Sequence, residues 1–136
     1  MCINMNIIYR LNFPLDPLEI VRVFDHSGIK RPTTELPRIA RMFAAPCLVF
    51  SAWDEEKLVG ISRSLTDYAY CCYLSDLAVD KEYQGYGIDQ ELVQRTKALI
   101  GDEVSLILLS APDAVSYYPQ IGFELTNNAY LIKRKR

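Results

Sequence analysis

The residues best suited to chemistry lie in one short segment that carries two closely spaced glycines. Residues 81–90 read Lys-Glu-Tyr-Gln-Gly-Tyr-Gly-Ile-Asp-Gln, so one residue separates Gly85 from Gly87. Glycines at this spacing let the backbone turn tightly and approach a ligand without a Cβ in the way. A helix that begins after the second glycine would present free N–H groups and positive potential to an anion. The segment therefore predicts a phosphate-binding loop.

Two common nucleotide motifs do not match this segment. It lacks the Gly-Lys-Ser or Gly-Lys-Thr of a P-loop, and the third glycine of the dinucleotide fingerprint would fall on Gln90. The structural alternative is a tight turn with no ligand, and the two glycines alone do not decide between these interpretations. For Asp89 the alternative to ligand contact is a role at the helix N-terminus, where an acidic side chain favours the dipole.

Other ligand-binding residues are scarce. The four cysteines, Cys2, Cys47, Cys71 and Cys72, form no C-x-x-C pair, and His26 is the one histidine. We therefore expect no metal site. Free thiols in a reducing compartment are the simpler interpretation, and we expect a cytoplasmic protein because no signal peptide or membrane span is apparent. His26 falls at the end of a predicted helix, where a structural role is expected.

Apolar spacing, prolines and glycines predict the elements that position the segment. Asp16 and Pro17 indicate the start of a helix and Gly28 its end. The apolar run from Val104 to Leu109 predicts a strand buried on both faces. In order, the predicted elements are strand 7–11, helix 17–27, a helix near 36–43, strands 47–53, 57–65 and 70–79, helix 87–100, strand 104–109, a short helix 113–119, and strands 123–125 and 129–133.

Length and composition limit the number of domains, the class of protein and the partners that can be expected. The chain has 136 residues, which predicts a single domain over 1–136. Half of the residues are hydrophobic and 24% are charged, which is typical of a folded globular protein rather than a disordered one. The formal net charge of −2 supplies no general attraction for nucleic acid or anionic lipid, and we expect neither as a partner. The basic run at 133–136 is interpreted as a solvated tail.

Two stretches together resemble a known family. Leu77-Ala78-Val79-Asp80 followed by Tyr83-Gln84-Gly85-Tyr86-Gly87-Ile88 resembles motif A of the GCN5-related N-acetyltransferases (GNAT). Tyr117-Tyr118-Pro119-Gln120-Ile121-Gly122-Phe123 is similar to a second landmark of that family, a tyrosine four residues before a Gly-Phe pair. The order of the predicted elements also matches the family.

The resemblance implies a fold and a cofactor. The fold is α/β (α+β), with a mixed, mostly antiparallel sheet, a central splayed parallel strand pair and flanking helices. The cosubstrate is acetyl-CoA, whose pantetheine arm would pair with the splayed strand and whose pyrophosphate would meet the glycine segment. The implied binding residues are Leu77, Ala78, Val79, Gln84, Gly85, Tyr86, Gly87, Ile88, Asp89 and Gln90.

The resemblance also implies catalytic roles. Tyr118 would protonate the departing CoA thiolate, and a phenol suits this role because its pKa of about 10 lies above that of a thiol. Its alternative is a packing aromatic. Asp76 is the one named candidate for the base, and its alternative is a solvated or hydrogen-bonded acid at a strand bulge. A water chain is the other route for the amine proton, because Leu106 occupies the strand position where some members carry a glutamate base.

The implied function is acetyl transfer from acetyl-CoA to a primary amine of an unidentified small molecule or peptide, by direct attack on the thioester. Asp89 and the missing glutamate motivate an alternative from another class, a CoA-binding module without turnover that acts as a sensor or subunit. A third class is a scaffold that binds no CoA. An exposed sheet edge near the C-terminal strands is compatible with a homodimer.

Overall fold

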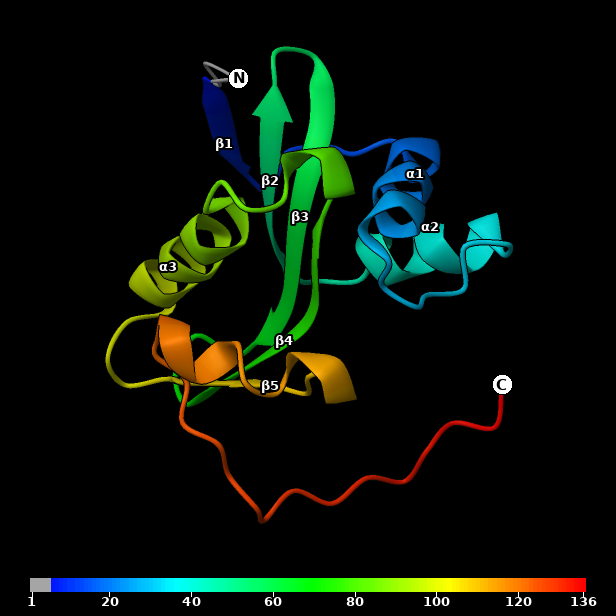
Figure 1. The fold of residues 1–136 in the computed structure, drawn as a ribbon. Coiled ribbons are helices and arrows are strands. Elements are labelled where there is room, and N and C mark those ends of the chain that lie inside the picture. Colours follow the sequence, from blue (N-terminus) through cyan, green and yellow to red (C-terminus); the bar gives the residue numbers. More distant parts are fainter. Residues whose placement is uncertain (1–5) are drawn as a thin grey trace.

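A computed structural model describes residues 6–136 and places five strands in one sheet (Figure 1). Strands β1 to β4 are joined in antiparallel pairs, whereas β4 and β5 are parallel. The sheet has the order β1-β2-β3-β4-β5, and the strands are Ile7–Leu11, Leu48–Asp54, Lys57–Thr66, Cys71–Val79 and Ser105–Leu108. The predicted mixed, mostly antiparallel sheet with one parallel pair is therefore confirmed, but this pair lies at the edge of the described sheet and not in its centre.

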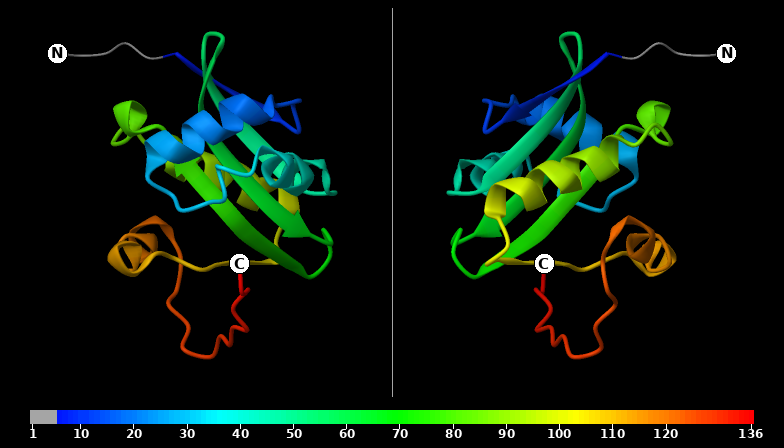
Figure 2. Two further views of the ribbon diagram at one scale, coloured as in Figure 1. Left: turned by 90° about the vertical axis from the view of Figure 1, so that its right-hand side faces the viewer. Right: turned by 90° about the vertical axis from the view of Figure 1, so that its left-hand side faces the viewer.

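Helices cover both faces of this sheet. Helix α1 (Pro17–Ser27) and helix α2 (Leu36–Ala44) lie on one face, and α3 (Ile88–Ile100) lies on the other (Figure 2). The Asp16 side chain accepts a hydrogen bond from the Leu18 N–H, and Gly28 ends α1 at a φ of 86°. The predicted boundaries of α1 are confirmed, because local capping chemistry determines them.

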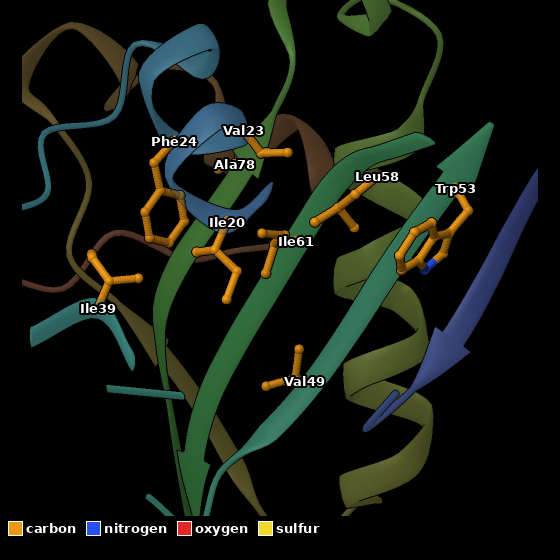
Figure 3. Packing of buried hydrophobic residues seen from close by; sticks show 9 residues of the cluster. All are labelled: Ile20, Val23, Phe24, Ile39, Val49, Trp53, Leu58, Ile61 and Ala78. Atoms are coloured by element: carbon orange, nitrogen blue, oxygen red, sulfur yellow. The ribbon is translucent and has the colours of Figure 1, made fainter. Parts of the chain in front are cut away.

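The core consists of two apolar clusters, one on each face. Figure 3 shows the cluster under α1 and α2, where Ile20 and Phe24 pack against Ile61 and Ala78 of the sheet. The second cluster lies under α3 and includes Leu92 with Phe50 and Cys72. Polar contacts also hold α1 against the sheet. The buried Asp80 carboxylate lies 3.5 Å from a guanidinium nitrogen of Arg22 and 3.4 Å from Nδ1 of His26, both on α1.

A bulge in β4 changes which side chains face each cluster. Arg63 of β3 is opposite Asp76, but the next residue, Ser64, is opposite Leu74, so Ser75 is the extra residue. Cys72 before the bulge packs under α3. Ala78, on the same alternation as Asp76, packs under α1. The bulge thus turns Asp76 towards the face of α1 and α2.

The region after β5 differs from the prediction. Two 3₁₀ turns, Pro112–Ala114 and Tyr118–Ile121, replace the predicted short helix over 113–119. Prolines 112 and 119 lack the N–H that a continuous α-helix needs, which explains the interruption. The strands predicted over 123–125 and 129–133 are also wrong, because residues 123–136 stay extended without pairing.

The prediction that residues 104–109 form a strand buried on both faces is also wrong, because residues 123–136 form no strand that covers it. Among the described residues 6–136, β5 pairs only with β4, and Ile107 and Leu109 are 49% and 56% exposed.

No helix in the described part of the chain is long and apolar enough to cross a membrane. Cys47, Cys71 and Cys72 carry free thiols, and Cys2 lies outside the described residues. The single domain over 1–136 stays a prediction.

The core makes one stability prediction. We expect Phe24→Ala to lower the free energy of unfolding by about 3–5 kcal/mol, because the fully buried ring would leave a cavity between α1 and the sheet. Leu18→Ala, on the same helix but 64% exposed, should change it by less than about 0.5 kcal/mol. Urea unfolding followed by circular dichroism measures both, and equal losses would contradict this account of the core.

Candidate active site

A cleft opens where β4 and β5 separate. Their pairing ends at Leu74 and Leu108, and beyond this point the cleft has a volume of about 750 Å³. Its walls are β4 residues 74, 75 and 77–79, the loop that follows α1, part of the glycine segment, and the turns after β5. Parallel strands that diverge leave backbone groups without partners, so the cleft is lined by main-chain donors and acceptors as well as by side chains.

The backbone of β4 presents a free strand edge to this cleft. The Asp80 N–H donates to the Val59 carbonyl of β3, and alternation along β4 then directs the backbone groups of Ala78 towards β3. The groups of Leu77 and Val79 consequently point the other way, into the space that β5 has left, where the Val79 carbonyl already accepts a hydrogen bond from the Gln84 side chain. An extended ligand with amide groups can therefore bind β4 as an additional strand.

The glycine segment lies at one end of the same cleft. Gly85 and Gly87 adopt φ values of 86° and 82°, and Gly87 is the residue before α3. Within residues 6–136, the N–H groups of residues 85–90 donate to no protein acceptor. A Cβ added at either glycine would point into open space. This is the geometry of an anion site at a helix N-terminus.

Two side-chain contacts hold the segment in place. The Tyr83 hydroxyl donates to the Asp54 carboxylate at 2.6 Å, which ties the 3₁₀ turn Lys81–Tyr83 to the β2–β3 hairpin. That hydrogen bond, together with burial, raises the Tyr83 pKa to about 12. The Gln84 side-chain amide donates to the Val79 carbonyl at 2.9 Å. The segment is thus fixed relative to β4 before any ligand binds.

The structure brings part of the predicted site together. The predicted residues that line the cleft are Leu77, Ala78, Val79, Gln84, Gly85, Asp89 and Tyr118. Gly87 and Gln90 belong to the N-terminus of α3 without lining the cleft wall, Tyr86 is 50% exposed, and Ile88 packs into the core under α3. A ligand role for Ile88 would therefore involve only its backbone.

Tyr118 is one of two tyrosines, with Tyr117, that line the cleft. Its ring lies edge-on to Tyr117 and to Phe123, with centroid distances of 5.3 and 5.6 Å. Burial, and secondarily the nearby Asp89 carboxylate, raises the Tyr118 pKa above its ordinary value. The group stays protonated at neutral pH, which is the state that an acid needs. Its catalytic role stays a prediction.

Asp89 has a partner that the sequence did not indicate. The Tyr117 hydroxyl donates a hydrogen bond to its carboxylate, which joins the start of α3 to the turns after β5. Burial and this hydrogen bond raise the Tyr117 pKa. The contact keeps one carboxylate oxygen occupied next to the anion site, and it places Tyr117 beside Tyr118. No spacing rule links residues 89 and 117, so only the folded chain shows the pair.

Asp76 does not face the cleft as a free carboxylate. It is fully buried, and its two oxygens accept hydrogen bonds from Arg31 and Arg63. Arg31 also donates to the Ser75 carbonyl at 2.6 Å, and Arg63 to the Ser75 hydroxyl at 3.3 Å. With both oxygens held by guanidinium groups, the carboxylate has neither oxygen directed at the cleft. The base role of Asp76 stays a prediction, and this geometry favours its structural alternative.

A comparison with known protein families shows to which family the chain belongs. The description "Acetyltransferase (GNAT) domain" matches residues 21–132, which include the cleft and every predicted site residue. The chain belongs to the GNAT acetyltransferase family. A chloroplastic GCN5-related N-acetyltransferase 2 of Arabidopsis thaliana is 38% identical over 73 residues, which are 52% of this chain and 28% of that protein. A Glycine max histone acetyltransferase, TAP1, is 30% identical over 73 residues, or 52% and 32% of the two chains. This GNAT chain thus matches about a third of the length of these relatives.

Solved structures agree with the GNAT fold. A GNAT family acetyltransferase of Streptococcus pneumoniae TIGR4 superposes with a TM-score of 0.72 at 19% identity, covering 96% of this chain and 100% of that one. An aminoglycoside N-acetyltransferase solved in complex with CoA gives 0.71 at 13% identity, covering 100% and 99%. Within residues 6–136, no three metal-ligating side chains gather in one place.

The buried ion pairs make a prediction about Asp76. We expect Asp76→Asn to lower the free energy of unfolding by about 3–5 kcal/mol, because it leaves the Arg63 guanidinium, 9% exposed, without a counter-charge. Asp25→Asn, an exposed site on α1, is the matched control and should have almost no effect. Urea unfolding measures both. A loss below about 1 kcal/mol for Asp76→Asn would mean that the carboxylate is not needed to neutralise these arginines.

Proposed function

We propose that this GNAT chain is an N-acetyltransferase that moves an acetyl group from acetyl-CoA to a primary amine. One observation carries the proposal: the free edge of β4 and the unpartnered N–H groups of residues 85–90 line or adjoin one cleft. A strand-like edge suits an amide-containing arm, and uncapped N–H groups suit a pyrophosphate. CoA contains both groups in one molecule.

The binding mode follows from these two surfaces. The pyrophosphate binds the backbone N–H groups of residues 85–90, and the pantetheine arm pairs with Leu77 and Val79. The thioester then lies further along the cleft, towards the bulge at Ser75 and the ring of Tyr118. Gly85 and Gly87 suit this approach, because each adopts a positive φ and a Cβ there would point into open space.

The chemistry is a direct transfer. The neutral amine nitrogen attacks the thioester carbonyl carbon, a C–N bond forms, and the C–S bond breaks. Tyr118 donates its hydroxyl proton to the departing thiolate, and the nitrogen loses its extra proton to water in the cleft. Holding both reactants in one cleft supplies much of the rate by proximity. Free backbone N–H groups of β4 are placed to stabilise the negative charge on the carbonyl oxygen.

The acceptor is an amine on a small molecule or a peptide, and the cleft does not single out one class. Its lining includes Lys30 and Arg31 as well as Asp89 and Asp113, so neither sign of charge dominates. The free thiols at Cys47, Cys71 and Cys72 are compatible with a reducing compartment, and a cytoplasmic location is part of the proposal.

The cofactor site gives a binding prediction. Acetyl-CoA at 100 times its Kd should add about 2.7 kcal/mol to the stability of the folded chain and raise Tm by about 10 °C. In Gly87→Trp this increase should vanish, because the indole would cover the N–H groups at the start of α3. Differential scanning fluorimetry with and without acetyl-CoA measures the increase.

Gly101→Trp is the control for backbone strain. Gly101 has a φ of 81° but a ψ of −174°, against 10° at Gly87, and it lies at the other end of α3, where a Cβ also points into open space. Because only glycine adopts that region readily, Gly101→Trp should lose more stability than Gly87→Trp without ligand, yet only Gly101→Trp should keep the increase with acetyl-CoA. No increase in the unmodified protein would contradict the proposal and favour a scaffold.

The catalytic prediction concerns Tyr118. Tyr118→Phe should lower kcat by about 100-fold or more while leaving the increase in Tm with acetyl-CoA unchanged, because the hydroxyl acts on the leaving group. Transfer is measured by release of free CoA thiol over a panel of amines. Binding without transfer in the unmodified protein would support the alternative, a CoA-binding module without turnover.

The pH profile tests the same role. Because burial, and secondarily the Asp89 carboxylate, raises the pKa of Tyr118, kcat should fall only above the ordinary tyrosine pKa of about 10. Asp89→Asn removes the smaller of these two causes, so the fall in kcat should move slightly towards pH 10. A fall in kcat below pH 10 in the unmodified protein would contradict Tyr118 as the acid.

A further inference from the structure

The segment that carries Tyr118 makes few polar contacts with the rest of the molecule. This turn segment, residues 109–123, contains the two 3₁₀ turns after β5, and its backbone hydrogen bonds beyond β5 join residues that are close neighbours in the sequence. The Gln120 side chain also donates within the segment, to the Ser116 carbonyl. In the described part of the chain, one side-chain hydrogen bond joins the turn segment to another element, and it runs from the Tyr117 hydroxyl to the Asp89 carboxylate.

Asp89 is held firmly at its own end of this bond. It follows Ile88, the first residue of α3, whose side chain is 2% exposed and packs into the cluster under that helix. The Glu91 N–H donates to the Gly87 carbonyl at 3.0 Å and so closes the first helical turn around Asp89. The bond from Tyr117 therefore ties the turn segment to a point whose position is fixed by core packing and helical hydrogen bonds.

The hydroxyls of the two neighbouring tyrosines differ in their use. Tyr117 and Tyr118 both line the cleft, but the Tyr117 proton points at Asp89. Burial, and then this hydrogen bond, raises the pKa of Tyr117, so the donor stays protonated over the neutral range. Within residues 6–136 the Tyr118 hydroxyl has no hydrogen-bond partner. Tyr118 is therefore the tyrosine whose proton is free to meet a ligand.

The place of Tyr117 determines the place of Tyr118. The two residues are adjacent, and their rings lie edge-on with a centroid distance of 5.3 Å. Phe123 also contacts the Tyr118 ring, at 5.6 Å, but it belongs to the same segment and moves with it. Apart from the connection to β5, the bond to Asp89 is thus the polar contact that sets the segment relative to the cleft in residues 6–136.

We propose that Tyr117 is a positioning residue that holds Tyr118 at the reacting thioester through its hydrogen bond to Asp89. The inference rests on the proposed acetyl transfer with Tyr118 as the acid. Tyr117 transfers no proton itself, because its proton stays in the bond to Asp89. When that bond is lost, the anion site keeps its donors, but the turn segment carries the acid away from the leaving thiolate. The role also explains an acidic residue at the start of a helix whose N–H groups face an anion.

Steady-state kinetics of Tyr117→Phe test this role, with acetyl-CoA and the amine that the unmodified chain acetylates fastest. We expect kcat to fall about 10-fold or more, because a hydrogen bond to a charged group is lost, while KM for acetyl-CoA stays within about twofold. Adding Tyr118→Phe to the Tyr117→Phe chain should cost far less than the roughly 100-fold expected in the unmodified chain, because the acid is already displaced. An unchanged kcat, or losses that simply multiply, would overturn the proposal.

Variants of Asp89 examine the other end of the bond. Asp89→Ala removes the acceptor and should lower kcat as Tyr117→Phe does, and the chain with both changes should be no slower than either single variant. Asp89→Asn keeps an oxygen that accepts the tyrosine proton, so its kcat should lie well above that of Asp89→Ala. Tyr70→Phe is the control, because it removes a hydroxyl from a side chain that is 78% exposed and outside the cleft. Additive losses in the chain with both changes would count against the proposal.

Hydrogen exchange followed by mass spectrometry measures the anchoring without acetyl-CoA or turnover. Backbone amides of residues 114–123 should exchange about 10-fold faster in Tyr117→Phe than in the unmodified chain, whereas those of α1 should not change. Tyr70→Phe should leave both regions as they are. Equal exchange of residues 114–123 in Tyr117→Phe and the unmodified chain would overturn the proposal even if kcat falls. If the unmodified chain transfers no acetyl group, the proposed function fails, and exchange alone decides whether Tyr117 anchors the segment.

Discussion

The separation of β4 from β5 is the constraint on which the rest of the site depends. It follows the bulge at Ser75, which bends β4 and turns Asp76 towards the face of α1 and α2. Arg63 from β3 and Arg31 from the loop after α1 both hold that carboxylate. A buried charge with two such partners is costly to rearrange, so the ion pairs fix the bulge and hold one wall of the cleft. The structural role of Asp76 is therefore to hold the bulge through these two arginines.

The anion site at the start of α3 is prepared in advance. Tyr83 is bound to Asp54 and Gln84 to the end of β4, so the loop with the two glycines has little freedom left. Preformed N–H donors bind an anion without the cost of ordering a loop. The Asp89 carboxylate next to this site accepts a hydrogen bond from Tyr117 and so connects the anion site to the turn that carries Tyr118. The proposed pyrophosphate site and the proposed acid are thereby linked through one pair of side chains.

The C-terminal region shows how an element can depend on its partner. A β-strand has no internal backbone hydrogen bonds, so residues 129–133 can have strand composition and still remain unpaired until another edge is present. Tyr130 and Ile132 are accordingly 99% exposed, and the groove of about 280 Å³ beside β5, lined in part by residues 106–110 and 123–126, is unfilled.

The sequence by itself determined the elements whose signals are local. Asp16, Pro17 and Gly28 set the limits of α1 by capping, and the glycine segment indicated an anion site because backbone conformation is coded within a few residues. Only the tertiary structure decided which distant groups meet: Asp76 with two arginines, Asp89 with Tyr117, and β5 with an unfilled groove. No sequence spacing reports such pairs, because a side chain's charge state and a strand's pairing depend on neighbours that only folding brings near.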